Sequence, residues 1–259
     1  MNIVVCLKQV PDTNEVRIDP KTGTLIREGV PSIINPDDKN ALEEALVLKE
    51  KYNAKVTVLS MGPPQAEKAL REALSMGADE AILLTDRAFA GADTLATSRA
   101  LAAALKNIPF DIVFAGRQAI DGDTAQVGPE IAEHLNLPQI TYVEKVTVEG
   151  KELKVRRALE DGYEIIKVKM PVLLTAIKEL NQPRYMNIKY IFGSADKEIT
   201  IWNVSNIDID PSFLGLSGSP TKVKKSMTKE AKGKGELVDK PAKEAVEYAI
   251  LKLKENHFI

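Results

Sequence analysis

The residues whose types and spacing most clearly suggest ligand chemistry lie in a loop with three glycines, at positions 116, 122 and 128. The apolar run 111–115 precedes this loop and a helical pattern around Glu130 follows it, which predicts a strand, a loop and a helix in that order. Glycine lets backbone approach a ligand closely, and the free N–H groups at a helix N-terminus favour an anion such as phosphate. Arg117 could add a planar, permanently charged fork for phosphate oxygens. A loop of this kind can also be purely structural, and the local pattern leaves that interpretation open.

The composition narrows the class of ligand and the cellular setting. The chain has 259 residues with 35 basic and 37 acidic side chains, so no excess charge favours nucleic acid or an anionic membrane. A single cysteine, Cys6, excludes an internal disulfide, and the two histidines, His134 and His257, give no basis for a metal site. No apolar stretch approaches the roughly 20 residues that span a bilayer, and no signal-peptide pattern precedes the first strand-like run. We therefore expect a cytoplasmic protein without direct membrane insertion.

Strand and helix patterns alternate in the first half of the chain. Continuous apolar runs are typical of strands buried on both faces of a parallel sheet. Four such runs cover residues 3–7, 55–60, 81–84 and 112–115, and the helical patterns that follow them begin near Asn35, Pro64, Thr94 and Asp123. Asn35 is expected to cap the first helix, and Asp123 and Gln126 are expected to form a capping box at the fourth.

This alternation predicts an α/β fold, in which a mainly parallel, doubly wound sheet carries helices on both faces. Ligands of such sheets bind at the carboxyl ends of the strands, at the point where the strand order reverses. We therefore expect segments 6–10 and 116–127, which follow the first and fourth strands, to face each other across a crevice.

The second half predicts antiparallel additions to this sheet. Apolar and polar residues alternate in segments 141–148, 152–159 and 163–169, and tight turns separate these segments, as in an antiparallel meander. Segment 171–177 adds one more apolar strand.

The C-terminal part predicts an extended arm and a helix. Segment 181–192 is apolar and aromatic without helix or strand periodicity, which favours a docking arm. Residues 214–240 have the composition of a linker, and 242–254 have the pattern of an amphipathic helix. We therefore divide the chain into an α/β domain with its arm, residues 1–213, and a linker with a helix, residues 214–259.

Six motifs, in this order, resemble the β subunit of an electron-transfer flavoprotein over nearly the whole chain. They are 5–12 (VCLKQVPD), the Asn35-Pro36 helix start with Ala41 and Glu44, 60–63 (SMGP), 76–79 (MGAD), the loop 116–128, and 180–185 (LNQPRY). The resemblance implies an adenine-nucleotide α-hydrolase-like fold and an obligate α subunit, whose mobile domain carries FAD and against which the C-terminal helix packs. It also implies an arm that meets an acyl-CoA dehydrogenase-type flavoenzyme.

The nucleotide of the β subunit differs between two groups of this family. In one group it is AMP, a structural ligand of a non-catalytic scaffold in an ordinary electron carrier. In the electron-bifurcating group the pocket holds FAD, which takes hydride from NADH and passes electrons to the α-subunit FAD and to ferredoxin. The chain is similar to the second group in 121–129 (DGDTAQVGP) and 91–98 (GADTLATS). Hydroxyls of Thr94 and Thr97 at a helix start could donate to FAD oxygens that AMP lacks, and helix capping is their alternative role.

The resemblance places a defined set of residues around the nucleotide and leaves the redox chemistry to the flavin. The set is Cys6, Asn35, Asp38, Met61, Asp93, Thr94, Thr97, Gly116, Arg117, Gln118, Ala119, Ile120, Asp121, Gly122, Asp123, Thr124, Ala125, Gln126 and Val127. Asp121 and Asp123 would repel a diphosphate, so we expect them to bond backbone or ribose hydroxyls. Structural roles are the alternatives, with Cys6 as a small buried hydrophobe and Met61 as core filler.

The arm supplies the predicted docking residues. Arg184 and Tyr185 are expected to shape it, and Ile188 is expected to be its apolar anchor on the partner. The alternative is that Ile188 packs against its own domain.

Overall fold

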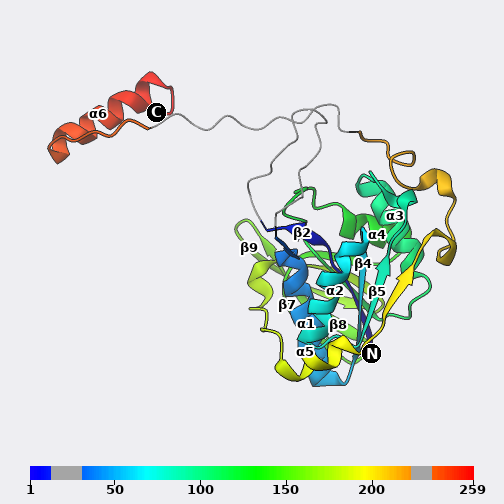
Figure 1. The fold of residues 1–259 in the computed structure, drawn as a ribbon. Helices are drawn as coiled ribbons and strands as arrows, with labels where there is room; N and C mark the ends of the chain where they lie inside the picture. Colours follow the sequence, from blue (N-terminus) through cyan, green and yellow to red (C-terminus); the bar gives the residue numbers. More distant parts are fainter. Residues whose placement is uncertain (13–30, 223–234) are drawn as a thin grey trace.

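The computed structural model describes residues 1–12, 31–222 and 235–259. Its centre is a nine-stranded sheet in the order β11-β5-β4-β1-β6-β10-β7-β8-β9 (Figure 1). The strands that pair in parallel at its core are β1 (Asn2–Cys6), β4 (Lys55–Met61), β5 (Glu80–Leu84), β6 (Ile112–Gly116), β10 (Val172–Ala176) and β11 (Ile199–Trp202). The predicted α/β fold with a mainly parallel sheet is confirmed.

The strand order reverses at β1. The chain runs from β1 to β4 and β5 on one side, and then returns to β6, which pairs with the other edge of β1. Val5 is therefore aligned with Val58 of β4 and with Phe114 of β6. Connections leave such a switch point in opposite directions and open a crevice above the carboxyl ends of the strands.

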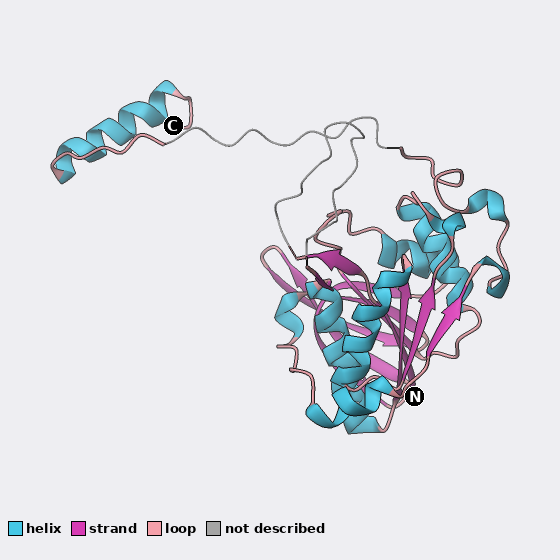
Figure 2. Ribbon diagram, in the orientation of Figure 1, coloured by secondary structure: helices cyan, strands magenta, loops and turns pink. Residues whose placement is uncertain are grey.

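Helices cover both faces of the sheet (Figure 2). Alternate side chains of β1 enter different cores: Ile3 and Val5 pack under α1 (Pro36–Tyr52) and α2 (Glu67–Met76), and Val4 and Cys6 pack under α3 (Thr94–Leu105) and α4 (Val127–His134). A strand between two helical layers needs apolar residues at consecutive positions, which explains the continuous runs in the sequence.

The predicted meander is confirmed as an extension of the same sheet. It consists of β7 (Gln139–Glu149), β8 (Glu152–Leu159) and β9 (Gly162–Lys169), which pair in antiparallel fashion. β10 lies between β6 and β7 and is parallel to both, so it connects the meander to the strands that border the switch point.

Several short elements have no periodic signal in the sequence. β11 adds an edge strand beside β5, and β2 (Gln9–Pro11) pairs with β3 (Ser32–Ile34) in a separate antiparallel ladder. Five short 3₁₀ helices complete the described part: η1 (Pro64–Ala66), η2 (Arg87–Phe89), η3 (Lys178–Leu180), η4 (Val204–Asn206) and η5 (Pro211–Phe213). Segments of three or four residues are too short for a repeat of two or 3.6 residues to stand out.

The prediction that segment 181–192 lacks a regular element is wrong for its last part. Residues from Ile188 onward form helix α5 (Ile188–Ala195), which packs on α2. The N–H of Asn187 donates to the carbonyl of Ser75 at 3.1 Å, and the hydroxyls of Ser75 and Ser194 lie 2.9 Å apart. The sequence of this helix does contain an apolar side with i, i+3, i+4, i+7 spacing, formed by Ile188, Ile191, Phe192 and Ala195, but two turns are too short for the pattern to stand out.

Packing against the domain continues past residue 213. Leu214 is 1% exposed, and the N–H of Leu216 donates to the carbonyl of Ala90 at 3.0 Å. Residues 223–234 of the predicted linker lie outside the described residues. The predicted final helix is α6 (Ala242–Glu255), which has no buried residue. No helix in the described ranges combines the length and the apolarity needed to cross a membrane.

Candidate functional site

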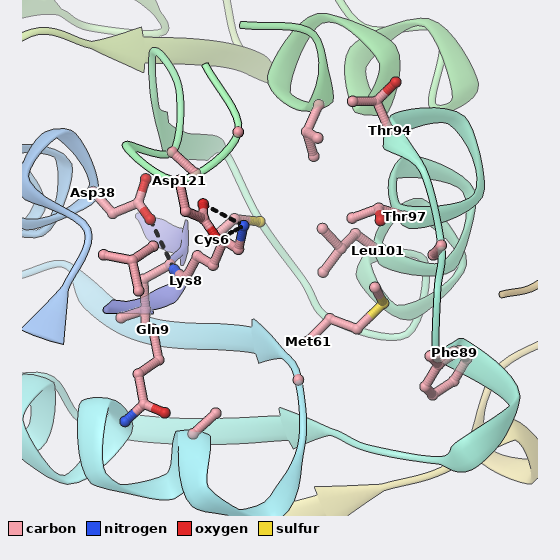
Figure 3. A pocket seen from close by; sticks show the side chains of 18 of the residues that line it. Cys6, Lys8, Gln9, Asp38, Met61, Phe89, Thr94, Thr97, Leu101 and Asp121 are labelled. Atoms are coloured by element: carbon pink, nitrogen blue, oxygen red, sulfur yellow. Dashed lines mark hydrogen bonds and ion pairs between the residues drawn. The ribbon is translucent and has the colours of Figure 1, made fainter. Parts of the chain in front are cut away.

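A crevice of about 1690 Å³ opens at the carboxyl ends of β1, β4 and β6, where the strand order reverses. Its two walls face each other in Figure 3. Lys8, Asp38 and Asp121 lie on one wall, and Thr94 and Thr97 of α3 lie on the other.

Asp38 holds the first wall together. Its Oδ2 accepts the N–H of Lys8 at 2.7 Å, and its Oδ1 accepts the N–H of Gly116 at 2.9 Å. Lys8 Nζ in turn lies 2.7 Å from Asp121 Oδ1, so segments 6–10 and 116–127 lie side by side on the same wall. The prediction that they face each other across the crevice is wrong, because α3 forms the opposite wall. Burial raises the pKa of the Asp38 carboxyl to about 7, although the two backbone hydrogen bonds oppose that shift.

Asn35 is the N-cap residue of α1, as predicted, but its side chain makes no capping hydrogen bond. The buried amide reaches the loop after β6 instead. Its Nδ2 donates to the carbonyl of Gln118 at 2.8 Å, and its Oδ1 accepts the N–H of Ile120 at 3.0 Å. The amide therefore pairs with loop backbone as a second strand would, and it fixes the loop against α1.

The loop backbone has the close approach and the unusual conformations of a shaped site. A Cβ at position 116 would lie 2.3 Å from Asp38 Oδ1, so only glycine fits there. Asp123 and Ala125 have φ values of 49° and 53°, in the left-handed region that non-glycine residues rarely adopt. Such residues cluster at functional sites, where the surrounding structure holds them.

Helix α4 begins at Val127, and the predicted capping box from Asp123 to Gln126 is wrong. The positive φ of Asp123 keeps it outside the helix, and the side chain of Gln126 makes no capping bond. The N–H groups of Val127 and Gly128 therefore have no partner within α4. Neither N–H donates to another group in the described part of the chain, and both residues line the crevice.

The charged side chains of the loop have protein partners. Arg117 Nε lies 3.4 Å from Asp37 Oδ2, and its guanidinium is 6.0 Å from the centroid of the Tyr142 ring. Asp123 Oδ1 accepts a hydrogen bond from Gln118 Nε2 at 2.8 Å. Asp121 and Asp123 thus bond the side chains of Lys8 and Gln118, where backbone was one expected partner. Their bonding to ribose hydroxyls stays a prediction.

The opposite wall is the N-terminal turn of α3 and the chain before it. Asp93 caps this helix, because its Oδ1 accepts the N–H of Ala96 at 3.0 Å. Thr94 Oγ1 lies 3.0 Å from Gln126 Oε1 and 3.2 Å from Glu130 Oε1, so it connects α3 to the start of α4. The capping role considered for Thr94 therefore belongs to Asp93. Thr97 lines the crevice about one turn further along α3.

The floor between the walls is apolar. It includes Cys6, Met61, Leu101, Ala115 and Ile131, which belong to or pack on the core under α3 and α4. Burial, with a smaller contribution from the nearby Asp38 carboxylate, raises the pKa of the Cys6 thiol to about 12. A thiol in this setting stays protonated and acts as a small hydrophobic side chain, not as a nucleophile.

Most residues of the predicted nucleotide set line this crevice. Asn35, Ile120 and Asp123 are not among the lining residues, and the other members of the set are. The structure adds Lys8, Phe89, Leu101 and Thr221. Lys8 could have been found, since it follows the first strand within segment 6–10, but Thr221 is distant in the sequence and has no local signal.

The predicted docking residues lie on a different part of the molecule. Arg184 forms ion pairs with Glu43 and Glu50 of α1, and its Nε lies 2.8 Å from Glu43 Oε2. Tyr185 is 97% exposed and Ile188 is 73% exposed. The alternative that Ile188 packs within its own domain therefore does not fit the structure.

The doubly wound sheet and the crevice at its switch point define the class of protein. It is an α/β protein of the kind that binds ligands at the carboxyl ends of its parallel strands. Within this class the chain belongs to the electron transfer flavoprotein family, since the model of the electron transfer flavoprotein domain matches residues 22–207.

Relatives that match along the full length agree with this assignment. An electron transfer flavoprotein subunit beta of Clostridium acetobutylicum is 73% identical over 100% of both chains. Subunit CarD of the caffeyl-CoA reductase-Etf complex of Acetobacterium woodii is 57% identical, and the acryloyl-CoA reductase electron transfer subunit gamma of Anaerotignum propionicum is 45% identical, each over 100% of both chains. The resemblance to electron-transfer flavoprotein β subunits is confirmed.

Proposed function

We propose that the chain is the β subunit of a heterodimeric, electron-bifurcating electron-transfer flavoprotein and that its crevice holds FAD. The bound FAD would supply hydride acceptance from NADH and one-electron transfer to the α-subunit FAD, which serves the dehydrogenase, and to ferredoxin. The observation that carries the proposal is the extent of the crevice, which reaches from the loop after β6 to the N-terminal turn of α3.

The residues that line the crevice fit a dinucleotide as large as FAD. The crevice volume of about 1690 Å³ exceeds the range of about 300–1,000 Å³ that is usual for small-molecule pockets. The N–H groups of Val127 and Gly128 and the positive end of the α4 dipole suit a phosphate group. At Gly122 an added Cβ would have no neighbour within 4 Å, so the loop is open to a ligand there.

The first wall and the floor have separate tasks in this proposal. Asp38 and Asn35 hold the loop in place for the ligand. Asp38 accepts a hydrogen bond from the loop backbone, and Asn35 both donates one to it and accepts one from it. Lys8 balances the charge of Asp121, so the carboxylate repels a diphosphate less. The apolar floor around Met61 and Leu101 excludes water from the ligand.

The relatives support a role within a larger assembly. One of them is named as a subunit of a caffeyl-CoA reductase-Etf complex and another as an electron transfer subunit of acryloyl-CoA reductase. By analogy, this chain would pair with an α subunit and serve an acyl-CoA dehydrogenase-type flavoenzyme. The exposed Tyr185 and Ile188 would contact that enzyme.

One observation favours the second candidate, a non-catalytic β subunit that holds AMP. The hydroxyl of Thr94 already contacts Gln126 and Glu130, so a ligand is not needed to satisfy it. Under this alternative the end of the crevice beside α3 would not be used for nucleotide binding.

Thr97 separates the two candidates, because it faces the crevice at the end that AMP would leave free. Loss of one hydrogen bond of about 0.5–1.5 kcal/mol should weaken FAD binding about two- to tenfold in Thr97→Val. We expect Thr97→Ser to bind FAD normally. The measurement is the FAD content of the αβ complex, with NADH-dependent flavin reduction as a second readout. The exposed Thr200 of β11 offers a matched control, Thr200→Val. Full FAD content and full reduction in Thr97→Val would remove this support for bifurcation.

A further inference from the structure

Residues 214–221, which we call the hook, fold back onto the domain at the α3 end of the crevice. The hook contacts residues 87–94, a stretch that we call the strap, and that includes η2 and the first residue of α3. The N–H of Leu216 donates to the carbonyl of Ala90 at 3.0 Å. A Cβ at Gly215 would lie 2.2 Å from the carbonyl oxygen of Ala88, and the φ of Gly215 is +54°, so this approach requires glycine.

The hook ends in a set of hydrogen bonds around Asp93. The N–H of Asp93 donates to Ser219 Oγ at 2.8 Å, and Ser219 Oγ donates to the carbonyl of Gly215 at 2.7 Å. Asp93 Oδ2 accepts the N–H of Thr221 at 3.0 Å and also the hydroxyl of Thr221. Because Asp93 Oδ1 caps α3 through Ala96, both carboxylate oxygens have partners within the chain.

These contacts favour the charged form of the cap. Burial alone would raise the pKa of Asp93, but the hydrogen bonds from Ala96 and Thr221 outweigh it, and the pKa is lowered. The carboxylate is therefore a fixed anion that joins the hook to the first turn of α3.

The strap is part of the crevice wall. Phe89, Gly91 and Asp93 line the cavity, as does Thr221 of the hook itself. Thr94, the last residue of the strap, and Thr97 lie in the first turn of α3, on the wall that faces the loop after β6 (Figure 3). The direction of these two side chains depends on how the first turn of α3 is held.

We propose that Ser219 and Thr221 are positioning residues for the crevice, and that through Asp93 they set the α3 wall for the part of FAD that extends beyond an adenylate; this rests on the proposed function. In this proposal Ser219 and Thr221 act through Asp93, whereas Thr97 contacts the ligand directly. The hook is thus a determinant of which nucleotide the subunit retains, because the loop after β6 is held by Asn35 and Asp38 and does not depend on the hook.

The test uses the full αβ complex depleted of nucleotide, titrated by calorimetry with FAD and, in parallel, with AMP. We expect Thr221→Val to weaken FAD binding about three- to tenfold, because the variant loses one hydrogen bond to the charged Asp93 and only part of that loss reaches the ligand. AMP binding should stay unchanged within about twofold. Thr221→Ser keeps the hydroxyl and should bind FAD as the unchanged chain does. Ser219→Ala should act as Thr221→Val does, and Thr200→Val, the same chemical change at an exposed site, should have no effect.

The outcomes separate this inference from the proposed function. Unchanged FAD binding by both Thr221→Val and Ser219→Ala would overturn the inference and leave the proposed function standing. Equal weakening of FAD and AMP would also overturn it, because general loss of stability affects both ligands. An unsubstituted complex that binds AMP but not FAD would refute the bifurcating function, and the inference with it.

Discussion

Asp38 is a buried carboxyl that accepts two backbone N–H groups, from Lys8 in the connection after β1 and from Gly116 at the end of β6. Burial raises its pKa from 3.8 to about 7, so between these values the folded chain keeps a proton that the unfolded chain releases. The contribution of this group to stability is therefore fully present below about pH 4 and is lost as the pH rises to about 7. Asp37, whose pKa burial also raises, adds a dependence of the same sign.

We predict that the free energy of unfolding falls less steeply over this pH window in Asp38→Asn than in the unsubstituted chain. Asparagine does not titrate, and it loses one acceptor, so the variant should also be less stable at each pH. Urea-induced unfolding between about pH 4.5 and about pH 7.5 measures both effects. Asp161→Asn in an exposed turn is the control. Identical slopes for Asp38→Asn and the unsubstituted chain would show that Asp38 is ionised throughout.

The partners of single residues were the least predictable feature of the site. Asn35 has the sequence context of a helix cap, yet its amide bonds backbone groups more than 80 residues away in the chain. The sequence predicts a helix start at Asp123, but this residue has a left-handed conformation and α4 begins only at Val127. A local sequence pattern shows which hydrogen bonds a side chain can make nearby. Which of them it makes depends on contacts with segments that are distant in the sequence.

At the scale of elements, the arm after η3 is held to α1 by charge. Arg184 pairs with Glu43 and Glu50, and the side chain of Glu43 is only 8% exposed. Removing one partner of a largely buried pair leaves the other charge desolvated and unpaired. We predict that Arg184→Met lowers the free energy of unfolding by about 2 kcal/mol, a value below that of a fully buried pair because Arg184 is partly exposed.

Lys178→Met tests whether that loss is specific, since Lys178 pairs with Glu179 at 3.7 Å and is 82% exposed. It should cost less than about 0.5 kcal/mol. The measurement is urea-induced unfolding of both variants. Equal effects would mean that the Arg184 pairs do not hold the arm.

The exposed Ile188, the proposed docking anchor, lies at the start of α5. If a dehydrogenase buries this side chain, about 1.5–3 kcal/mol of its binding free energy depends on it, so Ile188→Ala should weaken the complex about ten- to a hundredfold. Because Ile188 is 73% exposed, the melting temperature and flavin content should not change. Binding to the dehydrogenase is measured beside Ile201→Ala, an exposed isoleucine of β11. Unchanged affinity in Ile188→Ala would exclude it as the anchor.

Elements were predictable where they were long. The runs at 3–7 and 112–115 and the alternation at 141–148 became β1, β6 and β7, because burial on two faces or on one face leaves different periodicities. The four-residue β11 and the two-turn α5 were too short for their patterns to stand out. The hook is a further case, since its glycine-rich composition looked like a linker although close packing requires those glycines.

At the scale of the whole molecule, the crevice and the docking arm belong to different parts of the sheet. The crevice lies at the carboxyl ends of β1, β4 and β6, whereas α5 packs on α2 and the arm is tied to α1. The same α1 carries Asp38 at its first turn and Glu43 and Glu50 further along, so one helix supports both.

The central claim is that this subunit holds FAD. Its most direct test is to purify the complex of this chain with its α subunit, denature it, and identify and count the nucleotides released. The proposed function predicts two FAD and no AMP for each heterodimer. One FAD and one AMP would contradict it and establish the chain as the scaffold of an ordinary electron carrier.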